Sequence, residues 1–288
     1  MPNDYSEDQL IQRSAAEFLE KELGWTSVYA FDKEVLGVDG TLGRTSCHEV
    51  LLTRHFYKAL KALNPWLTDK QLAEAVERMT ERMSSQTLMQ INEQKYQLIR
   101  DGIPVTRVKP NGETEVVRAK IIDFQSPEKN EFLCVRELWV YGALYRRRAD
   151  IVGFVNGIPL LFIELKNHDV EVVDAFNQNY RDYLDTIPQL FYFNAFVMFS
   201  NGLEARVGMI DSKWEFFHEW KRLKEEDAGN IELPTMLRGV CKKENFLDLL
   251  ENFILYDHSG GTTAKIMARN HQYLGVNQAV EKYRNRNC

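Results

Sequence analysis

Two apolar segments joined by Asn156-Gly157 are the feature that most constrains the fold of this chain. Asn-Gly is a strong hairpin signal, and segments that are apolar on both faces are typical of strands in the middle of a sheet. A carboxylate stands at the outer end of each segment, Asp150 before the first and Glu164 after the second, and Lys166 follows. An isolated buried charge is very unfavourable. The sequence therefore predicts a buried β-hairpin whose two acids have a partner.

The register of this hairpin decides whether the two acids meet. A regular two-residue turn would set Asp150 opposite Ile163 and turn Glu164 to the other face, because a one-residue slip inverts every side chain. A three-residue loop, 155–157, with a left-handed, bulged glycine at its end sets Asp150 opposite Phe162 instead. The acids then become diagonal neighbours on one face, about 7 Å apart at Cβ. We therefore expect the odd loop or a bulge.

A hard divalent cation is the natural partner for two carboxylates. We predict that Asp150 and Glu164 ligate Mg²⁺ and that the main-chain carbonyl of Leu165 adds a ligand. Such an ion polarises a scissile phosphate and lowers the pKa of a bound water. Lys166 shares the face of Glu164, because residues two apart in a strand point the same way, and it would orient the water or offset charge on the phosphorus. The predicted chemistry is hydrolysis of a phosphodiester, and the alternative is an ordinary surface salt bridge between Glu164 and Lys166.

Three arginines, Arg146, Arg147 and Arg148, stand just upstream of the hairpin acids. They are predicted to bind DNA through its backbone phosphates, contacts that position a duplex without reading its sequence. A solvated strand edge is the alternative. The formal net charge of the chain is −6, so any contact with nucleic acid must be local.

The rest of the chain predicts an α/β fold, a mixed central β-sheet flanked by helices. A capping box at residues 6–9 opens a first helix, and an apolar stripe continues to Gly24. A helical insertion is expected over about 48–98, a further helix over 170–184, and helices from 244 onward. Strand signals separated by turn residues fall at 26–31, 103–108, 115–124, 132–141, 195–200 and 205–210.

Composition argues against several other classes of protein. Four cysteines lie far apart and form no CxxC pair, which disfavours a zinc ribbon or a disulfide framework and fits the reducing cytoplasm. The six histidines show no paired zinc spacing. No signal peptide is recognisable, and the longest apolar run is far too short to span a bilayer, so no membrane partner is expected.

The stretch 145–166, YRRRADIVGFVNGIPLLFIELK, closely resembles the PD-(D/E)xK nuclease motif in the motor/nuclease (R) subunit of type I restriction enzymes. The likeness continues through 40–52, 63–68, 175–202, 214–221 and 250–280, and so covers nearly the whole chain. It implies a restriction-endonuclease-like fold and a type I site-specific deoxyribonuclease, which cleaves unmodified foreign double-stranded DNA. Asp150, Glu164 and Lys166 match the residues of that family's DNA-cleavage centre.

The resemblance also suggests accessory residues on two helices. Family members often carry a glutamine and a tyrosine four residues apart on the helix after the motif. Here Asn179 and Tyr183 are four apart, whereas Gln178 and Tyr183 are five apart, so either Gln178 or Asn179 faces the site. An acid of the first helix also contributes in related RecB-like nucleases. Three acids on the predicted first helix are candidates, and the first is the best match: Glu7, Glu17 and Glu20.

The family implies partners and a cofactor for the whole subunit. A superfamily 2 DNA-translocating motor that uses ATP follows the nuclease domain, and methyltransferase and specificity subunits choose the target. No G-x-x-x-x-G-K-[ST] motif occurs in this chain. We therefore expect a fragment with a nuclease domain over 1–238 and, over 239–288, a helical linker and the start of the motor. Two alternatives stay open: a docking module whose nuclease centre is silent in isolation, and a RecB-like exonuclease.

Overall fold

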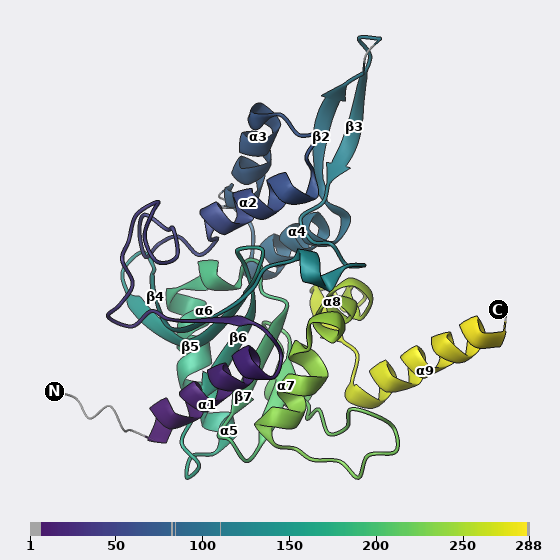
Figure 1. Cartoon of the computed structure of the whole chain (residues 1–288). Coiled ribbons are helices and arrows are strands. Elements are labelled where there is room, and N and C mark those ends of the chain that lie inside the picture. Colours follow the sequence, from purple (N-terminus) through teal and green to yellow (C-terminus); the bar gives the residue numbers. More distant parts are fainter. Residues whose placement is uncertain (1–6, 82, 84, 110, 287–288) are drawn as a thin grey trace.

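The chain folds around a six-stranded mixed β-sheet (Figure 1). The structure, a computed structural model, describes residues 7–81, 83, 85–109 and 111–286. Across the sheet the strands follow in the order β1, β4, β5, β6, β7 and β8. Their bounds are Thr26–Tyr29, Phe132–Tyr141, Arg146–Val155, Ile158–Leu165, Phe196–Ser200 and Ala205–Gly208. β1 pairs with β4 and β6 with β7 in parallel, and the other neighbours are antiparallel, which confirms the predicted mixed sheet.

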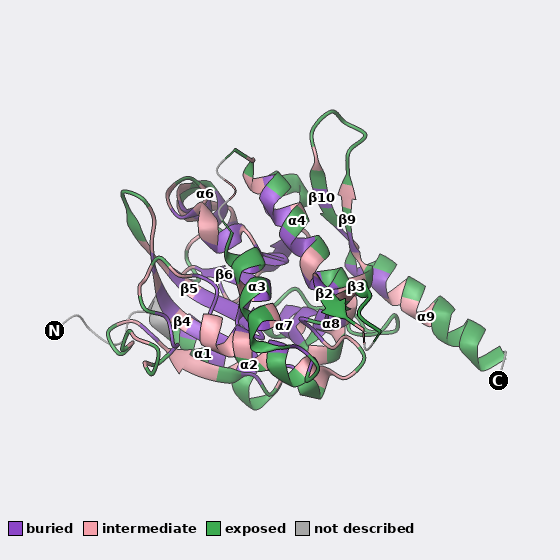
Figure 2. Ribbon diagram, turned by 90° about the horizontal axis from the view of Figure 1, so that it is seen from above, coloured by how far each residue is buried: buried purple, intermediate pink, exposed green. Residues whose placement is uncertain are grey.

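Helices cover both faces of this sheet (Figures 1 and 2). α1 (Glu7–Lys21) packs on β1, β4, β5 and β6 from one side. The helical segment after β6 packs on β5, β6 and β7 from the other side. It consists of α5 (Val172–Asp174), a π-helical stretch (Ala175–Tyr180) and α6 (Arg181–Thr186). The helix predicted over 170–184 is therefore confirmed, although its π-helical middle was not predicted.

Each face of the sheet has its own aromatic cluster. Phe196 and Phe199 are both on β7 and differ in strand parity, so they point to opposite faces. The ring of Phe196 lies 5.1 Å from that of Phe246, and the ring of Phe199 lies 5.3 Å from that of Tyr180. Because both faces are covered, β6 is buried along its whole length, and the central strands appear in the colour of buried residues in Figure 2.

The helical insertion predicted over 48–98 is confirmed as α2 (Thr53–Leu63), α3 (Asp69–Thr80) and α4 (Leu88–Asp101), which lie between β1 and β4 in the chain. A hairpin of β2 (Ile103–Val108) and β3 (Thr114–Ala119) follows and projects from the body of the molecule (Figure 1). The strand predicted over 115–124 ends early. Lys120, the next residue, donates its N–H to Asn64 Oδ1 at 2.8 Å, and its carbonyl accepts from Asn64 Nδ2 at 2.7 Å. The Asn64 side chain thus takes the place of a neighbouring strand as the hydrogen-bond partner of the Lys120 main chain.

The prediction of helices alone after residue 244 is wrong. α7 (Leu233–Cys241) and α8 (Lys243–Asn252) lead to a small hairpin of β9 (Ile254–Asp257) and β10 (Ala264–Met267), and α9 (Asn270–Arg286) follows. The buried Lys265 ties this hairpin to the core, because its Nζ donates to Asn92 Oδ1 at 2.9 Å and to the Asn194 carbonyl at 2.6 Å. Such tertiary contacts override local sequence preference. The division into domains at residue 238 stays a prediction.

The connections between these elements include short 3₁₀ helices at Pro127–Lys129, Pro188–Phe191 and Trp214–Phe216. Among the described residues, no helix has both the length and the apolar character that a bilayer-spanning segment requires. The capping box predicted at residues 6–9 depends on Ser6, which lies outside the described residues.

Candidate active site

The β5–β6 hairpin turns through two residues, so the predicted three-residue loop is wrong. Val155 pairs directly with Ile158. Asn156 and Gly157 have φ angles of 52° and 80°, the left-handed conformation that a tight hairpin turn requires. Leu52, just before α2, donates its N–H to the Gly157 carbonyl at 2.9 Å, and a Cβ on Gly157 would lie 2.6 Å from the Leu52 carbonyl oxygen. The segment before α2 therefore lies directly against the turn and leaves no room for a side chain at position 157.

The two acids nevertheless meet, because a bulge restores the parity that the prediction required. The pairing of β5 with β6 shifts at one point and then joins Ile151 to Ile163. Continued by one residue, this register sets Asp150 directly opposite Glu164. The predicted position of Asp150 opposite Phe162 is therefore wrong. The observed register differs from the predicted one by an even number of residues, so the face of the sheet to which Asp150 belongs is unchanged. The ladder ends at the Ile151–Ile163 pair, and beyond it Asp150 and Glu164 line one cavity and repel each other.

Both carboxylate oxygens of Asp150 accept a hydrogen bond. Gln12 Nε2 of α1 donates to Oδ1 at 2.8 Å, and the main-chain N–H of Leu165 donates to Oδ2 at 2.8 Å. Burial raises the pKa of Asp150 to about 7; the Leu165 N–H acts in the opposite direction, and repulsion from Glu137 adds to the rise. The protein alone therefore compensates the negative charge of this carboxylate poorly.

Glu164 is buried, and only one of its oxygens is satisfied by the protein. Oε1 accepts a hydrogen bond from Asn179 Nδ2 at 2.5 Å and lies 3.5 Å from Lys166 Nζ. Oε2 is buried and has no hydrogen-bond partner among the described residues. Burial and the neighbouring Asp150 raise the pKa of Glu164 well above its ordinary value, and Lys166 opposes them only in part. An open, buried oxygen beside a second carboxylate favours a bound cation.

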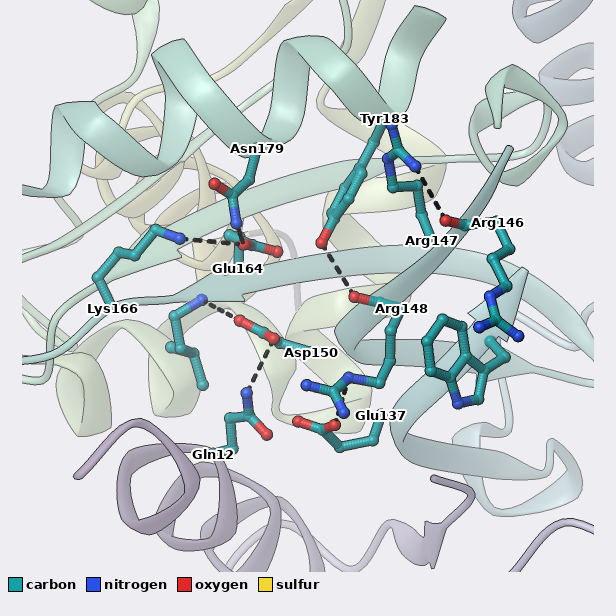
Figure 3. A pocket seen from close by; sticks show the side chains of 12 residues that line it. Gln12, Glu137, Arg146, Arg147, Arg148, Asp150, Glu164, Lys166, Asn179 and Tyr183 are labelled. Atoms are coloured by element: carbon teal, nitrogen blue, oxygen red, sulfur yellow. Dashed lines mark hydrogen bonds and ion pairs between the residues drawn. The ribbon is translucent and has the colours of Figure 1, made fainter. Parts of the chain in front are cut away.

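These groups line an open cavity of about 490 Å³ between α1 and the helical segment after β6 (Figure 3). The predicted site residues that line it are Arg146, Arg147, Arg148, Asp150, Glu164, Leu165, Lys166, Asn179 and Tyr183. Gln12, Glu137 and Trp139 complete the lining. The structure thus gathers residues from six elements of the fold into one place: α1, β4, β5, β6, the π-helical stretch and α6.

The three arginines differ in how strongly the protein holds them. Arg147 pairs with Asp182 of α6, from Nη2 to Oδ1 at 2.8 Å. Arg148 Nε lies 2.6 Å from Oε2 of Glu137. Within the described part of the chain, no carboxylate pairs with Arg146, whose guanidinium lies 5.1 Å from the centre of the Trp139 ring. Arg146 is therefore the arginine of this run most available to a ligand.

Asn179, rather than Gln178, faces the acids. Gln178 is exposed, whereas Asn179 is partly buried and donates to Glu164. Both residues belong to the π-helical stretch, and single π-helical turns inside α-helices are frequent at functional sites. Tyr183 Oη donates to the main-chain carbonyl of Arg148 at 2.9 Å, which fixes α6 to β5.

The first helix contributes an amide to the cavity. Glu7 begins α1, but its side chain lies outside what the structure describes. Glu17 is exposed and pairs with Lys21 at 2.9 Å, and Glu20 is exposed as well. From this helix the Gln12 side chain reaches the cavity and donates to Asp150, whereas the role predicted for Glu7 stays a prediction.

Sequence reasoning missed two polar residues of the site, Gln12 and Glu137. Glu137 is buried on β4, level with Asp150 on the neighbouring strand, and has a φ angle of 58°, which is uncommon for a residue other than glycine. Burial raises its pKa, and the Arg148 guanidinium opposes that rise. Glu137 also interrupts an apolar strand, which is the sequence signal by which Asp150 is recognised. Gln12 interrupts the buried face of α1 in the same way.

Comparison with known proteins shows the family. Residues 4–216 match the family described as type I restriction enzyme R protein N terminus. The type I restriction enzyme HindI endonuclease subunit of Haemophilus influenzae is 32% identical over 271 residues, which are 91% of this chain and 25% of that protein. The putative type I restriction enzyme MjaIXP endonuclease subunit of Methanocaldococcus jannaschii is 30% identical over 301 residues, 96% of this chain and 28% of that protein. The chain therefore spans about a quarter of the length of these relatives, and it belongs to the family of type I restriction enzyme R protein N-terminal regions.

Proposed function

We propose that this chain is the magnesium-dependent endonuclease part of a type I restriction enzyme R subunit and that it cleaves double-stranded DNA by phosphodiester hydrolysis. One observation carries the proposal: Asp150 and Glu164, both with raised pKa values, line one cavity together with Lys166. The names of the two relatives, both endonuclease subunits, support it.

The residues present fit a hard divalent ion. The buried Oε2 of Glu164 lacks a hydrogen-bond partner in the described residues, and a cation would relieve its repulsion with Asp150. No group of three or more histidine, cysteine or acidic side chains in the described part of the chain is arranged to hold a metal. The ion would rest on the two carboxylates, the Leu165 carbonyl and water, and magnesium commonly binds through one or two carboxylates and keeps several waters. When bound, it would supply a polarised phosphate and a more acidic water.

The side chains around the acids have separable roles in this proposal. Lys166 Nζ, 3.5 Å from Glu164 Oε1, would orient the attacking water and offset negative charge at the phosphorus. Gln12 of α1 would fix Asp150, and Asn179 of the π-helical stretch would fix Glu164. Arg146 would bind a backbone phosphate, because no carboxylate among the described residues pairs with its guanidinium, which packs on the Trp139 ring.

In the whole restriction enzyme, other parts would choose the target and move the DNA. Methyltransferase and specificity subunits would choose the target, and an ATP-driven motor would translocate the DNA. The formal net charge of −6 supports this division. A chain that held DNA over a wide surface by itself would be expected to be basic.

The test is nicking of supercoiled plasmid in magnesium by the parent chain and by the variants Asp150→Ala and Lys166→Ala. Lys70→Ala is the matched control, because the Lys70 side chain on α3 is 87% exposed. Nicking by the parent and the control alone supports the proposal. Equal nicking by all four proteins would overturn it. Degradation of linear DNA with closed circles left intact would indicate an exonuclease that needs a free end.

The projecting β2–β3 hairpin favours a second candidate function. Val108 is 66% exposed and Val116 is 72% exposed, an apolar surface on an arm that stands away from the body (Figure 1). Such an arm suits a docking module that binds another subunit while its nuclease centre is silent in isolation. Metal-dependent nicking by the isolated chain, abolished by Lys166→Ala, would count against this candidate.

A further inference from the structure

The turn between β4 and β5 is held tightly against the body. The Gly142 N–H donates to the Tyr145 carbonyl at 2.8 Å and closes the turn. Gln189 Nε2 donates to the Tyr141 carbonyl at 2.8 Å. A Cβ on Gly142 would lie 1.9 Å from the Thr186 carbonyl oxygen, so the main chain of the turn presses on the end of α6. The turn is therefore fixed to the helical segment that lines the cavity.

The tip of this turn exposes two large side chains. Leu144 is 87% exposed and Tyr145 is 56% exposed. Single exposed apolar residues are common on protein surfaces, but these two are adjacent, stand on an anchored turn and border the arginine run. The Arg147 guanidinium lies 5.2 Å from the centre of the Tyr145 ring and is itself held by Asp182. The Arg147 guanidinium thus packs against the Tyr145 ring, and the rest of the Tyr145 side chain is exposed to solvent.

Arginines and aromatic rings alternate from this tip to the acids. The guanidinium groups of Arg146 and Arg148 lie 5.1 Å and 5.7 Å from the centre of the Trp139 ring. All three of these residues line the same cavity as Asp150. Guanidinium groups bind phosphates, and flat rings stack on bases, so a surface that combines them suits nucleic acid. An apolar protein partner would explain the exposed leucine but not the arginines beside it.

We propose that Leu144 and Tyr145 form a wedge that enters the base stack beside the cleavage site, so that the preferred substrate is DNA with locally unpaired strands. The proposal rests on the proposed nuclease function. Apolar side chains inserted between base steps partly unstack them, and an aromatic ring stabilises a base that has left the stack. An extended strand from Tyr145 to Asp150 spans roughly 17 Å. At about 3.4 Å per base pair, the wedge would act about five base pairs from the scissile phosphate.

The test is binding of the whole chain to DNA labelled with 2-aminopurine, without divalent metal, so that nothing is cut. One DNA carries an unpaired bubble with the probe inside it, and a second is fully paired. The parent is compared with the double variant Leu144→Ser, Tyr145→Ser and with Val116→Ser, whose residue on β3 is 72% exposed. Thermal melting checks that all three proteins are folded, and the same proteins are assayed for cleavage of both DNAs in magnesium.

We expect the parent and Val116→Ser to bind the bubble at least about tenfold more tightly than the paired duplex, because stacking on one base has an effect of that size. The parent should also change the fluorescence of the 2-aminopurine probe when it binds the bubble. The double variant should lose both the preference for the bubble and this change in fluorescence. Equal bubble binding by the parent and the double variant, with cleavage intact, would overturn the wedge and leave the nuclease standing. The exposed pair would then belong to a protein interface. A parent that neither binds nor cleaves either DNA would overturn both proposals.

Discussion

Gln12 of α1 and Asp150 of β5 are joined by a hydrogen bond of 2.8 Å that connects the first helix to the hairpin acid. The other oxygen of Asp150 accepts a hydrogen bond from the Leu165 N–H, so both oxygens of the carboxylate are held. An amide at this position supplies a donor without adding negative charge to a cavity that already contains Glu137 and Glu164. This arrangement orients a candidate metal ligand while limiting repulsion.

Gln12→Leu is expected to lower magnesium-dependent cleavage by about 10- to 100-fold, because loss of a group that orients a metal ligand typically has an effect of that size. The measurement is the nicking rate over a range of magnesium concentrations. Arg13→Leu is the matched control, because Arg13 is the next residue of α1 and is exposed. Equal rates for the two variants would mean that Asp150 does not need this donor.

Asn179→Ala is expected to reduce cleavage by about tenfold or more, because it leaves Glu164 without its closest hydrogen-bond donor. Gln178→Ala changes a neighbouring, exposed side chain and should stay within about twofold of the parent. The two variants are compared in one nicking assay at fixed magnesium concentration. A larger loss for Gln178→Ala would show that the helix presents its other face to the acids during cleavage.

Asp150→Asn is expected to stabilise the metal-free protein above neutral pH. The pKa of Asp150 is about 7 in the fold and 3.8 ordinarily, so the stability that this group contributes is fully present below pH 3.8 and is lost as the pH rises through 7. The free energy of unfolding of the variant, relative to the parent, should therefore rise between pH 4 and pH 8, by about 1 kcal/mol or more.

Urea unfolding at several pH values measures this difference, with the exposed Asp39→Asn as control. Magnesium should reduce the difference, because an ion that binds the folded parent stabilises it. A difference that does not change with pH would contradict the assignment of a raised pKa to Asp150.

Lys265→Met is expected to flatten the rise of stability with pH between about 7 and 10.5. Burial lowers the pKa of Lys265 from 10.5 to about 7. Its contribution is therefore present above pH 10.5 and is lost as the pH falls through 7, where the buried amine must take up a proton. Unfolding by urea at pH 7 and pH 9 gives the slope, and Lys70→Met on the exposed face of α3 should leave it unchanged. An unchanged slope in Lys265→Met would contradict the account.

The sequence predicted that Asp150 and Glu164 share a face, but it did not predict how. The parity follows from the two-residue period of a strand and from the unfavourable energy of an unpaired buried charge, both of which are local. The hairpin that contains the bulge is contacted by partners distant in the sequence. The carbonyl of Leu160 on β6 accepts the Ala195 N–H at 2.7 Å, and the Leu52 carbonyl closes over the turn.

Other predictions also succeeded where the interacting residues are close in the sequence and failed where they are distant. The capping box of Thr68 and Gln71 follows from the local sequence alone, because its donors and acceptors are within four residues. The choice between Gln178 and Asn179 depends on a π-helical stretch that the sequence pattern did not predict. The β9–β10 hairpin depends on Lys265 and Asn92, which meet only in the folded chain. Contacts between distant residues are therefore where prediction from sequence failed.

The central claim is that Asp150, Glu164 and Lys166 form a magnesium-dependent cleavage centre. The most direct measurement is nicking of supercoiled plasmid by the parent and by Glu164→Gln, each with magnesium and with a chelator. Glutamine keeps the shape of glutamate and removes its charge, so the comparison isolates the carboxylate. The account predicts nicking by the parent in magnesium and none in the other three reactions. Nicking by Glu164→Gln at the rate of the parent, or by the parent in the chelator, would contradict it.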